Sequence, residues 1–370
     1  MRELAYIQKI KTLTPIAGAD KIECATVLGW ELVVKKGEFK VDDLCVYCEI
    51  DSILPEYPCF EFLRSKKFRI KTVKLKGQIS QGIAFPLSIL NEVNPTFNIS
   101  KVKVGDDVTE VLKITKYDSE VELDTPDPIK KSWLQNKVSY YKWKLFGFKR
   151  VKAGDFPNDV PKTDEIRVQK MASALEVHQN DTMYITEKCE GTSATFVYRK
   201  DGNWLAKMFG NGYIFQACSR NRIVYNSRNG KESPHHITEV AKKYNLLEGM
   251  RSLNRNLAIQ GEVIGPKIQG NIYKLPELEL RVFSIFDIDA QTYLAFQELL
   301  SITSQLNLLT VPVLESNHTL VNSIKYYVDL SKGASQINPN TQREGIVIRS
   351  ISKNFSFKSI NPEYLLQQEL

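Results

Sequence analysis

The peptide Thr186–Ser193, with the sequence TEKCEGTS, places one lysine in a tight turn between two predicted strands. Residues Met183–Ile185 before it and Ala194–Tyr198 after it are β-prone, and Asp201-Gly202 then predicts a turn into a third strand. The Lys-x-x-Gly spacing recurs elsewhere in the chain, but only Lys188 lies between two such strands with a carboxylate on either side. The peptide therefore predicts a strand-turn-strand unit with a reactive lysine. The alternative interpretation is a surface lysine in a hairpin.

A lysine attacks phosphorus only as the neutral amine. The pKa of a free lysine side chain is about 10.4, so the side chain is charged at neutral pH. A nearby cation, such as a divalent metal or a second lysine, disfavours the ammonium form. A reactive Lys188 therefore predicts partners elsewhere in the chain, among them cations that lower its pKa.

Side chains suited to binding a nucleotide follow Lys188 in the sequence. A guanidinium can hold phosphate with two hydrogen bonds, a carboxylate can hold a hard metal ion or accept from a ribose hydroxyl, and an aromatic ring can stack on a base. The candidates are Arg220, Glu262, Phe283, Glu344 and Lys358. Each of them, taken singly, also has a purely structural interpretation.

In this order the residues closely resemble the motifs of the covalent nucleotidyltransferase superfamily, which includes polynucleotide ligases and messenger-RNA capping enzymes. The resemblance covers motif I (Lys188 to Gly191), motif Ia (Ser219 and Arg220), motif III (Glu262), motif IIIa (Phe283 to Ile288), motif IV (Glu344) and motif V (Lys358). Glu187 and Thr192 make motif I look more like that of RNA ligases than of DNA ligases. Two positions depart from the pattern. Ser356 replaces the first lysine of motif V, with Lys353 as a candidate substitute, and Glu190 replaces an aspartate or histidine.

The resemblance implies an ATP-dependent RNA ligase that uses Mg²⁺ or Mn²⁺. Lys188 would attack the α-phosphorus of ATP, the adenylate would pass to an RNA 5′-phosphate, and a 3′-hydroxyl would displace AMP, with a nick in duplex-held RNA as the expected substrate. The implied contacts are the adenine edge for Glu187, the base for Phe283, ribose or phosphate for Arg220 and Glu262, metal for Glu344 and the α-phosphate for Lys358. The alternatives are a DNA ligase, a capping-type guanylyltransferase and a non-catalytic RNA-binding protein.

The expected fold class is α+β, with an N-terminal OB-type β-barrel followed by a mixed, largely antiparallel nucleotidyltransferase domain of the ATP-grasp-like ligase type. Residues 1–115 contain five predicted short strands, the last over Lys101–Thr109, separated by Gly and Pro. Segments Ala17–Glu23 and Lys76–Gly82 resemble the OB module that precedes the catalytic domain in one family of RNA ligases. Only 12 residues follow Lys358, which leaves no room for the C-terminal OB domain of capping enzymes and most DNA ligases.

Two further segments complete the predicted domain organisation. Residues 116–155 read as a linker rich in basic and aromatic side chains, and residues 156–370 as the catalytic domain. Thr163 followed by two acids predicts the start of a helix, and further helices are predicted over 234–244, 292–306 and 320–330.

A basic run without acids crosses the predicted barrel and suggests contact with an RNA backbone. It comprises Arg64, Lys66, Lys67, Arg69, Lys71, Lys74 and Lys76. The alternative interpretation is a strand edge whose lysines discourage pairing with another chain.

Composition limits the class of protein. The chain has 370 residues, a net charge of +7, no apolar run of about 18 residues and no signal-peptide core, so we expect an intracellular monomer that binds RNA and no membrane. Cys45-x-x-Cys48 has the spacing of a zinc ligand pair. Within a strand, however, the two sulfurs would point to opposite faces, which favours reduced thiols over zinc.

Overall fold

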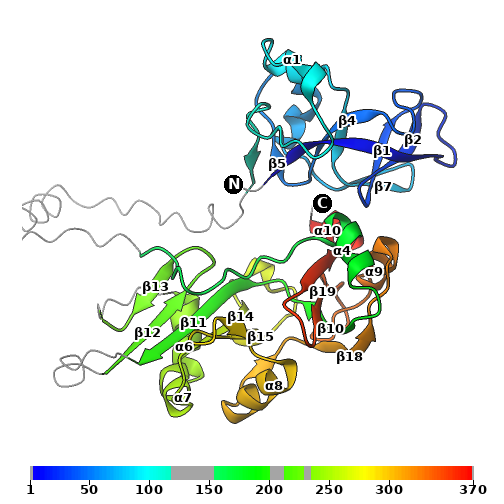
Figure 1. Ribbon diagram of the computed structural model, residues 1–370. Helices are drawn as coiled ribbons and strands as arrows, with labels where there is room; N and C mark the ends of the chain where they lie inside the picture. The colour runs from blue at the N-terminus through cyan, green and yellow to red at the C-terminus, as the bar shows by residue number, and fades with distance from the viewer. Residues whose placement is uncertain (1–2, 118–153, 201–211, 229–234, 369–370) are drawn as a thin grey trace, which may run out of the picture. The chain divides into compact units, whose positions relative to one another are not determined.

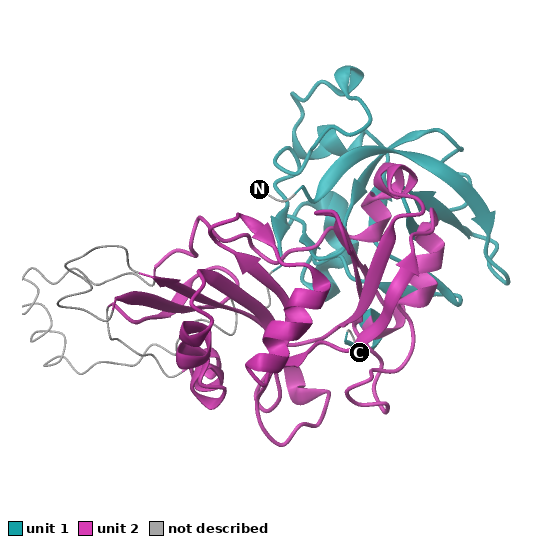
Figure 2. Cartoon of the chain, turned by 60° about the horizontal axis from the view of Figure 1, so that its bottom comes forward, with its two compact units in different colours: residues 1–149, 365–370 teal, residues 150–364 magenta. Residues whose placement is uncertain are grey.

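The computed structural model describes residues 3–117, 154–200, 212–228 and 235–368. The chain divides into two compact units, residues 1–149 with 365–370, and residues 150–364 (Figure 2). The predicted basic and aromatic linker, residues 116–155, lies almost entirely outside the described residues.

The first unit contains a five-stranded antiparallel sheet in the order β3-β2-β1-β4-β8 (Figure 1). The strands are β1 (Ala5–Pro15), β2 (Ile22–Val27), β3 (Trp30–Lys35), β4 (Leu44–Cys48) and β8 (Ile83–Phe85). The long strand β1 pairs with β4 along its first half and with β2 along its second, and its register shifts between Ile10 and Thr12. The smaller elements are β5 (Ser52–Ile53), β9 (Thr115–Lys116), β6 (Val73–Leu75), β7 (Gln78–Ser80), α1 (Ile89–Val93), η1 (Pro58–Lys66) and η2 (Ile99–Lys101).

The predicted fifth strand, Lys101–Thr109, is wrong. This segment follows β1 through backbone hydrogen bonds at Asp106 and Val108 and a single bridge between Tyr6 and Asp107, without forming a strand. The alternating hydrophobic pattern of Lys101–Val104 is too short to maintain pairing, and β8 takes the fifth place in the sheet.

Strand β4 of this sheet is buried on both faces. Cys45 belongs to the cluster around Trp30 and Tyr47, whereas Cys48 belongs to a second cluster with Phe60. The two thiols therefore lie on opposite faces, as strand alternation predicts. Burial raises the pKa of Cys45 to about 12 and also raises that of Cys48, so both are expected to remain protonated thiols.

The second unit contains two sheets. One has the order β13-β12-β11-β14-β15-β16, with β17 parallel to β15, and the other has the order β18-β10-β19-β20. The larger sheet comprises β11 (Thr192–Lys200), β12 (Tyr213–Cys218), β13 (Ile223–Asn226), β14 (Leu257–Ile264), β15 (Glu279–Asp287), β16 (Thr292–Tyr293) and β17 (Leu309–Thr310). The smaller sheet comprises β10 (Thr182–Lys188), β18 (Val313–Thr319), β19 (Gly345–Ser350) and β20 (Ser356–Ile360).

Helices cover one face of each sheet. Below the larger sheet, a cluster that includes Phe196, Ile259 and Val282 packs against α6 (His236–Lys243), α7 (Leu246–Ser252) and α8 (Phe296–Gln305). On one face of the smaller sheet, Ile185, Ile348 and Phe357 pack against η3 (Val168–Lys170), α4 (Ala172–Val177) and α9 (Ile324–Leu330), and α4 and α9 are labelled beside it in Figure 1. The remaining short elements are η4 (Gln269–Asn271) and α10 (Pro362–Gln368). The opposite face of the larger sheet is partly covered by a smaller hydrophobic cluster that includes Val197, Ala258 and Phe286.

The predicted helix start at Thr163 is wrong. Residues 161–167 contain no helix, and among the described residues of this unit the first α-helix begins at Ala172. Thr163 bonds to the side chain of Ser193 at 3.1 Å instead of capping a helix. The three other helix predictions are confirmed by α6, α8 and α9.

Substitutions of Phe357 test the packing of the hydrophobic core between the smaller sheet and its helices. It is fully buried, and its ring centroid lies 5.0 Å from that of Tyr327. We expect Phe357→Ala to lower the free energy of unfolding by about 3–5 kcal/mol because it leaves a cavity, and Phe357→Leu to lower it by less. Urea unfolding followed by circular dichroism measures both, and equal midpoints for the two variants would contradict the packing described.

Candidate active site

Lys188 forms an ion pair at the end of the smaller sheet. It is the last residue of β10 and lies opposite Gly345, the first residue of β19, so Glu344 directly precedes the paired position. Lys188 Nζ is 2.6 Å from Glu344 Oε1, and the two side chains are only 27% and 17% exposed. The strand register therefore brings together two residues 156 positions apart, counted from 188 to 344.

Two glycines permit this close approach. A Cβ at Gly345 would lie 2.2 Å from the carbonyl oxygen of Ser359, and a Cβ at Gly191 would lie 2.4 Å from that of Val263. Neither contact leaves room for a side chain, since the obstructing atoms belong to the backbone. Glycine at these positions lets the chain around Lys188 and Glu344 pack closely.

The pKa of Lys188 is raised. Burial by itself would lower it, but the carboxylates of Glu344 and Glu262 together outweigh this effect. The expectation that surrounding cations lower the Lys188 pKa is therefore wrong for this structure. Acids adjoin the amine, and it loses its proton readily only when their charge is compensated.

Lys358 shows the opposite behaviour. It lies on β20, opposite Val347 of β19, and its backbone bridges to Arg167. Burial, together with the ammonium of Lys188 and the guanidinium of Arg167, lowers the pKa of Lys358 to about 7. Lys358 is thus a half-buried amine whose charged form an anionic ligand would stabilise.

Glu190 is a third acid near the pair. Its backbone N–H donates to the Tyr273 hydroxyl at 2.7 Å, which fixes the turn after β10. Burial raises the pKa of Glu190 to about 7, and the charge of Glu344 adds to this, against a hydrogen bond from Tyr364. A glutamate at this position therefore stays within electrostatic range of Lys188, although its carboxyl group is partly protonated near neutral pH.

The acids fit a divalent metal that also binds a ligand. Glu344 Oε2 is buried and has no hydrogen-bond partner among the described residues. The described residues contain no cluster of three or more His, Cys, Asp or Glu side chains that could hold a metal alone. Mg²⁺ commonly binds through one or two carboxylates, with phosphate oxygens and water completing its shell. The free oxygen of Glu344, with Glu262 nearby, suits such a shared site.

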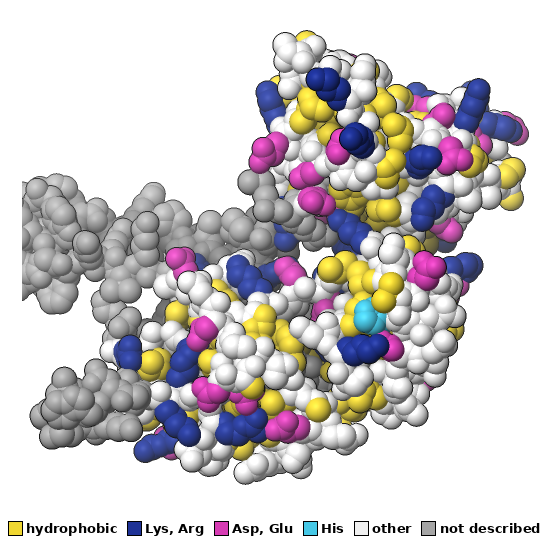
Figure 3. Space-filling model, viewed as in Figure 1, with side chains coloured by type: hydrophobic (Ala, Val, Ile, Leu, Met, Phe, Trp, Pro, Cys, Tyr) yellow, Lys and Arg dark blue, Asp and Glu magenta, His cyan; other side chains and the backbone are white. Residues whose placement is uncertain are grey.

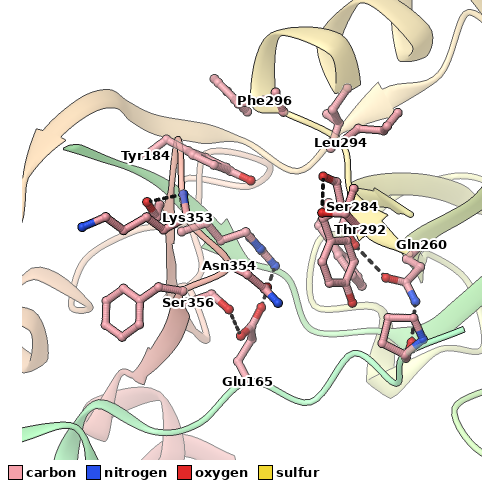
Figure 4. A pocket seen from close by; sticks show the side chains of 18 of the residues that line it. Glu165, Tyr184, Gln260, Ser284, Thr292, Leu294, Phe296, Lys353, Asn354 and Ser356 are labelled. Carbon is pink, nitrogen blue, oxygen red and sulfur yellow. Dashed lines mark hydrogen bonds and ion pairs between the residues drawn. The ribbon is translucent and has the colours of Figure 1, made fainter. Parts of the chain in front are cut away.

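A cavity of about 420 Å³ lies between the two sheets (Figure 4). Tyr184 and Arg349 line it from the smaller sheet, and Gln260, Phe283 and Ser284 line it from the larger one. Tyr184 is on the same face of β10 as Lys188, four residues earlier, which corresponds to about 13 Å along a strand. The cavity and Lys188 therefore share one sheet face, and Phe283 is available in the cavity wall for stacking.

Arg349 places a cation in the cavity. It is 13% exposed, with Nη1 donating to Thr186 Oγ1 at 3.2 Å and Nη2 lying 3.4 Å from Glu165 Oε1. Its Cζ lies 5.6 Å from the centroid of the Phe283 ring. Arg349 is directly opposite Ser356 in the register of β19 and β20. The predicted substitute Lys353 instead binds Asp181 at 2.6 Å, so its charge is already paired.

Residues 161–167 form a strap that connects the two sheets. On the larger sheet, Gln260 Nε2 donates to the Pro161 carbonyl at 2.8 Å. On the smaller sheet, Ser356 Oγ donates to Glu165 Oε2 at 2.5 Å, and the Lys358 N–H donates to the Ile166 carbonyl at 2.8 Å (Figure 4). The strap therefore crosses the cleft beside the cavity.

Arg220 is held by this strap. Its guanidinium forms an ion pair with Asp164, and the two side chains are 28% and 60% exposed. Such a partly solvated pair contributes little stability and can exchange partners. Arg220 thus lies on the larger sheet's side of the cleft, where a ligand could compete with Asp164.

The side chain of Glu187, predicted to contact the adenine edge, does not line the cavity. Alternation along β10 directs Lys188 to the cleft face and Glu187 to the face covered by α4 and α9. Glu187 is 1% exposed and does not line the cavity. The structure therefore brings Lys188, Glu262, Glu344 and Lys358 together, places Phe283 in the cavity wall, and separates the Glu187 carboxylate from them.

The predicted RNA-binding side chains of the first unit form two groups. Arg64 pairs with Glu61 at 2.5 Å, and Arg69 pairs with Asp51 at 2.6 Å, so both guanidinium charges are partly neutralised. The lysines are Lys66, Lys67, Lys71, Lys74 and Lys76, of which all but Lys71 are exposed. Basic and acidic side chains are interspersed over the face shown in Figure 3. The four exposed lysines remain the best candidates for phosphate contacts.

Two basic residues near the site were not predicted. Arg167 ends a charged run that was assigned to a helix, and only its backbone bridge to Lys358 reveals its position. Arg349 did carry a signal, because alternation after Glu344 puts residues 345, 347 and 349 on one face.

Comparisons with known proteins identify both units. Residues 181–360 match a family model described as RNA ligase, and residues 4–87 match one described as an OB-fold domain. The comparison with curated proteins gives no match. Over the residues that the structure describes, no helix is long and apolar enough to span a membrane.

Solved structures of Naegleria gruberi RNA ligase resemble the whole chain. The structure with PPi has 34% sequence identity and a TM-score of 0.79, covering 100% of this chain and 99% of that one. A glutamate-to-alanine variant with ATP and Mn has 33% identity, a TM-score of 0.80 and complete coverage of both chains. A lysine-to-alanine variant with ATP and Mn has 34% identity and a TM-score of 0.78 and covers 99% of each chain.

The lowered pKa of Lys358 makes a prediction about stability. Between about pH 7 and pH 10.5 the unfolded chain holds a proton on Lys358 that the folded chain lacks, so the free energy of unfolding should rise with pH across this window. Lys358→Met should remove this rise. Urea unfolding of both proteins from about pH 7 to about pH 10 measures the difference, and parallel curves would contradict the lowered pKa.

Proposed function

The chain belongs to the RNA ligase family, and from that premise we propose that it seals RNA through an adenylate formed on Lys188 with ATP and a divalent metal. The observation that carries the proposal is the pair between Lys188 Nζ and Glu344 Oε1 at 2.6 Å, with Lys358 nearby. A nucleophile, an acid with a free oxygen and a second, half-buried amine are thereby placed on one sheet face. ATP and Mn are present in structures of the similar Naegleria gruberi enzyme.

In the first step, the neutral Lys188 amine attacks the α-phosphorus of ATP. The N–P bond forms as the bond from the α-phosphorus to the bridging oxygen breaks, and pyrophosphate leaves with the electron pair. Because Glu344 raises the Lys188 pKa, the amine gives up its proton more easily when the charge of Glu344 is compensated. A divalent metal held by Glu344 would offset negative charge on the phosphates.

Lys358 and Arg167 would favour the same step. Negative charge grows on the phosphate oxygens as pyrophosphate departs, and buried cations stabilise that charge more strongly than solvated ones. The pKa of Lys358 is lowered to about 7 mainly by burial, so an incoming phosphate would raise it and keep the side chain charged. Phe283 in the cavity wall supports a base-stacking role, and Arg220 and Glu262 support contacts to ribose or phosphate.

We further propose that the adenylate passes to a 5′-phosphate and that a 3′-hydroxyl then displaces AMP. An oxygen of the 5′-phosphate would attack the α-phosphorus, which breaks the N–P bond and returns the electron pair to Lys188. The exposed lysines of the first unit, Lys66, Lys67, Lys74 and Lys76, support contact with the phosphates of a nicked duplex. One chain supplies every residue named, so a monomer suffices.

The first step can be tested by labelling. Incubation with α-labelled ATP and Mn²⁺ or Mg²⁺ should give a covalent label on the wild-type protein that survives alkali and is released by acid, and none on Lys188→Ala, because only the amine forms the acid-labile N–P bond. Lys353→Ala, whose cation is paired with Asp181, should label as wild type does. Labelling by GTP in place of ATP would favour a capping-type enzyme, and absence of any Lys188-dependent label would overturn the proposal.

The strand requirement needs a separate experiment. On matched nicks in RNA, DNA and hybrid duplexes, we expect the RNA nick with 3′-hydroxyl and 5′-phosphate ends to be sealed fastest. Sealing is measured by gel separation of the joined strand with each metal in turn. Equal sealing of the DNA nick would indicate a DNA ligase, and tight binding of the RNA nick without sealing would indicate a non-catalytic RNA-binding protein.

A further inference from the structure

Glu187 is adjacent to the nucleophile but faces away from it. On β10 it lies opposite Ile346, whose side chain belongs to the buried cluster beneath the smaller sheet. The Glu187 N–H donates to the Pro312 carbonyl at 2.9 Å, which keeps this strand end in place. A carboxylate that is 1% exposed on the core face must have a local partner to be tolerated there.

That partner is a single loop. Ser335 Oγ donates to Glu187 Oε1 at 2.5 Å, and the Gln336 N–H donates to Oε2 at 2.8 Å. Ser335 Oγ also accepts the N–H of Ile337 at 3.0 Å, so its proton is directed to Glu187. Burial raises the Glu187 pKa, and both hydrogen bonds oppose that rise. Each carboxylate oxygen of Glu187 is therefore occupied by the loop.

The loop ends at the acid that pairs with Lys188. Residues 333–343 close on themselves, since the Ser335 N–H donates to the Thr341 carbonyl at 2.9 Å and the Arg343 N–H donates to the Gly333 carbonyl at 3.0 Å. The next residue is Glu344. At the end of β10, Lys188 points to one face and Glu187 to the other. Through Glu187, the same strand end binds the loop that immediately precedes Glu344.

We propose that Glu187 is a positioning residue that sets the distance between Glu344 and Lys188, and that it does not read the adenine base. The inference rests on the proposed function, because it concerns the acid assigned to the metal and to the nucleophile. Loss of the Glu187 carboxylate would leave the Ser335 hydroxyl and the Gln336 N–H without their acceptor, and the loop would then hold Glu344 less firmly. Small displacements of catalytic groups are costly, by up to roughly 100-fold in rate for about 1 Å.

Two variants break the link from either side, and a third serves as the control. Glu187→Ala removes the acceptor, and Ser335→Ala removes one donor while leaving Glu187 in place. Ser331→Ala is the matched control, because Ser331 is also fully buried but its hydroxyl donates to the Val328 carbonyl. In the full-length protein, we expect backbone hydrogen exchange over residues 333–343 to accelerate in the first two variants and not in the control. Unchanged exchange would overturn the proposal even if no adenylate forms in any protein.

The kinetic test separates positioning from base recognition. In both variants, adenylate formation should slow by roughly 10- to 100-fold, and the metal concentration for half-maximal rate should rise, while the ratio of kcat/KM for ATP to that for GTP stays at the wild-type value. Glu187→Gln keeps one acceptor oxygen and should recover part of the rate. A changed ATP-to-GTP ratio would assign Glu187 to the base instead. Failure of the wild-type protein to label would count against the proposed function, whereas the exchange result judges the loop independently.

Discussion

The ion pair between Lys188 and Glu344 organises the second unit. Desolvating two charges is costly, so the pair persists only where the fold fixes both groups within hydrogen-bonding distance. Antiparallel pairing of β10 with β19 supplies that precision, and Gly345 allows β20 to pack against the same point. The pair in turn keeps Lys188, the proposed nucleophile, as an ammonium ion. Its reactivity therefore depends on what neutralises Glu344, and the protein avoids keeping a permanently uncharged amine.

Strand alternation places the proposed site residues of the smaller sheet on one face and their sequence neighbours on the other. Lys188 and Lys358 project into the cleft, while their immediate neighbours Glu187 and Phe357 belong to the opposite, helix-covered face. Each of these two lysines therefore has a sequence neighbour that is fixed, by buried hydrogen bonds for Glu187 and by core packing for Phe357. Such support is what holds a catalytic geometry to within fractions of an ångström.

The sequence allowed most of the named strands, apart from Lys101–Thr109, and three helices to be predicted, because local periodicity and short motifs carry that information. Contacts between segments far apart in the sequence could not be predicted from these local signals. Thr163 has the local signature of a helix cap, yet Ser193 captures its hydroxyl. Glu187 matched a motif, but its partner Ser335 lies 148 residues away. The pKa of Lys188 was predicted with the wrong sign, since the balance between Glu344, Glu262 and burial exists only in the folded chain.

The strap of residues 161–167 has a consequence for how the cleft is made. Its polar contacts bridge two sheets whose helix-covered faces have separate hydrophobic clusters, and they add to the contact between Arg349 and Phe283. The segment comes before both sheets in the chain, yet it can dock only after they exist, so its closure should be a late event in folding. A fragment that started at Val168 would retain every strand of the two sheets but would lose the strap that connects them. A segment that precedes all of the proposed catalytic residues in the chain therefore helps to hold the two walls of the cleft together.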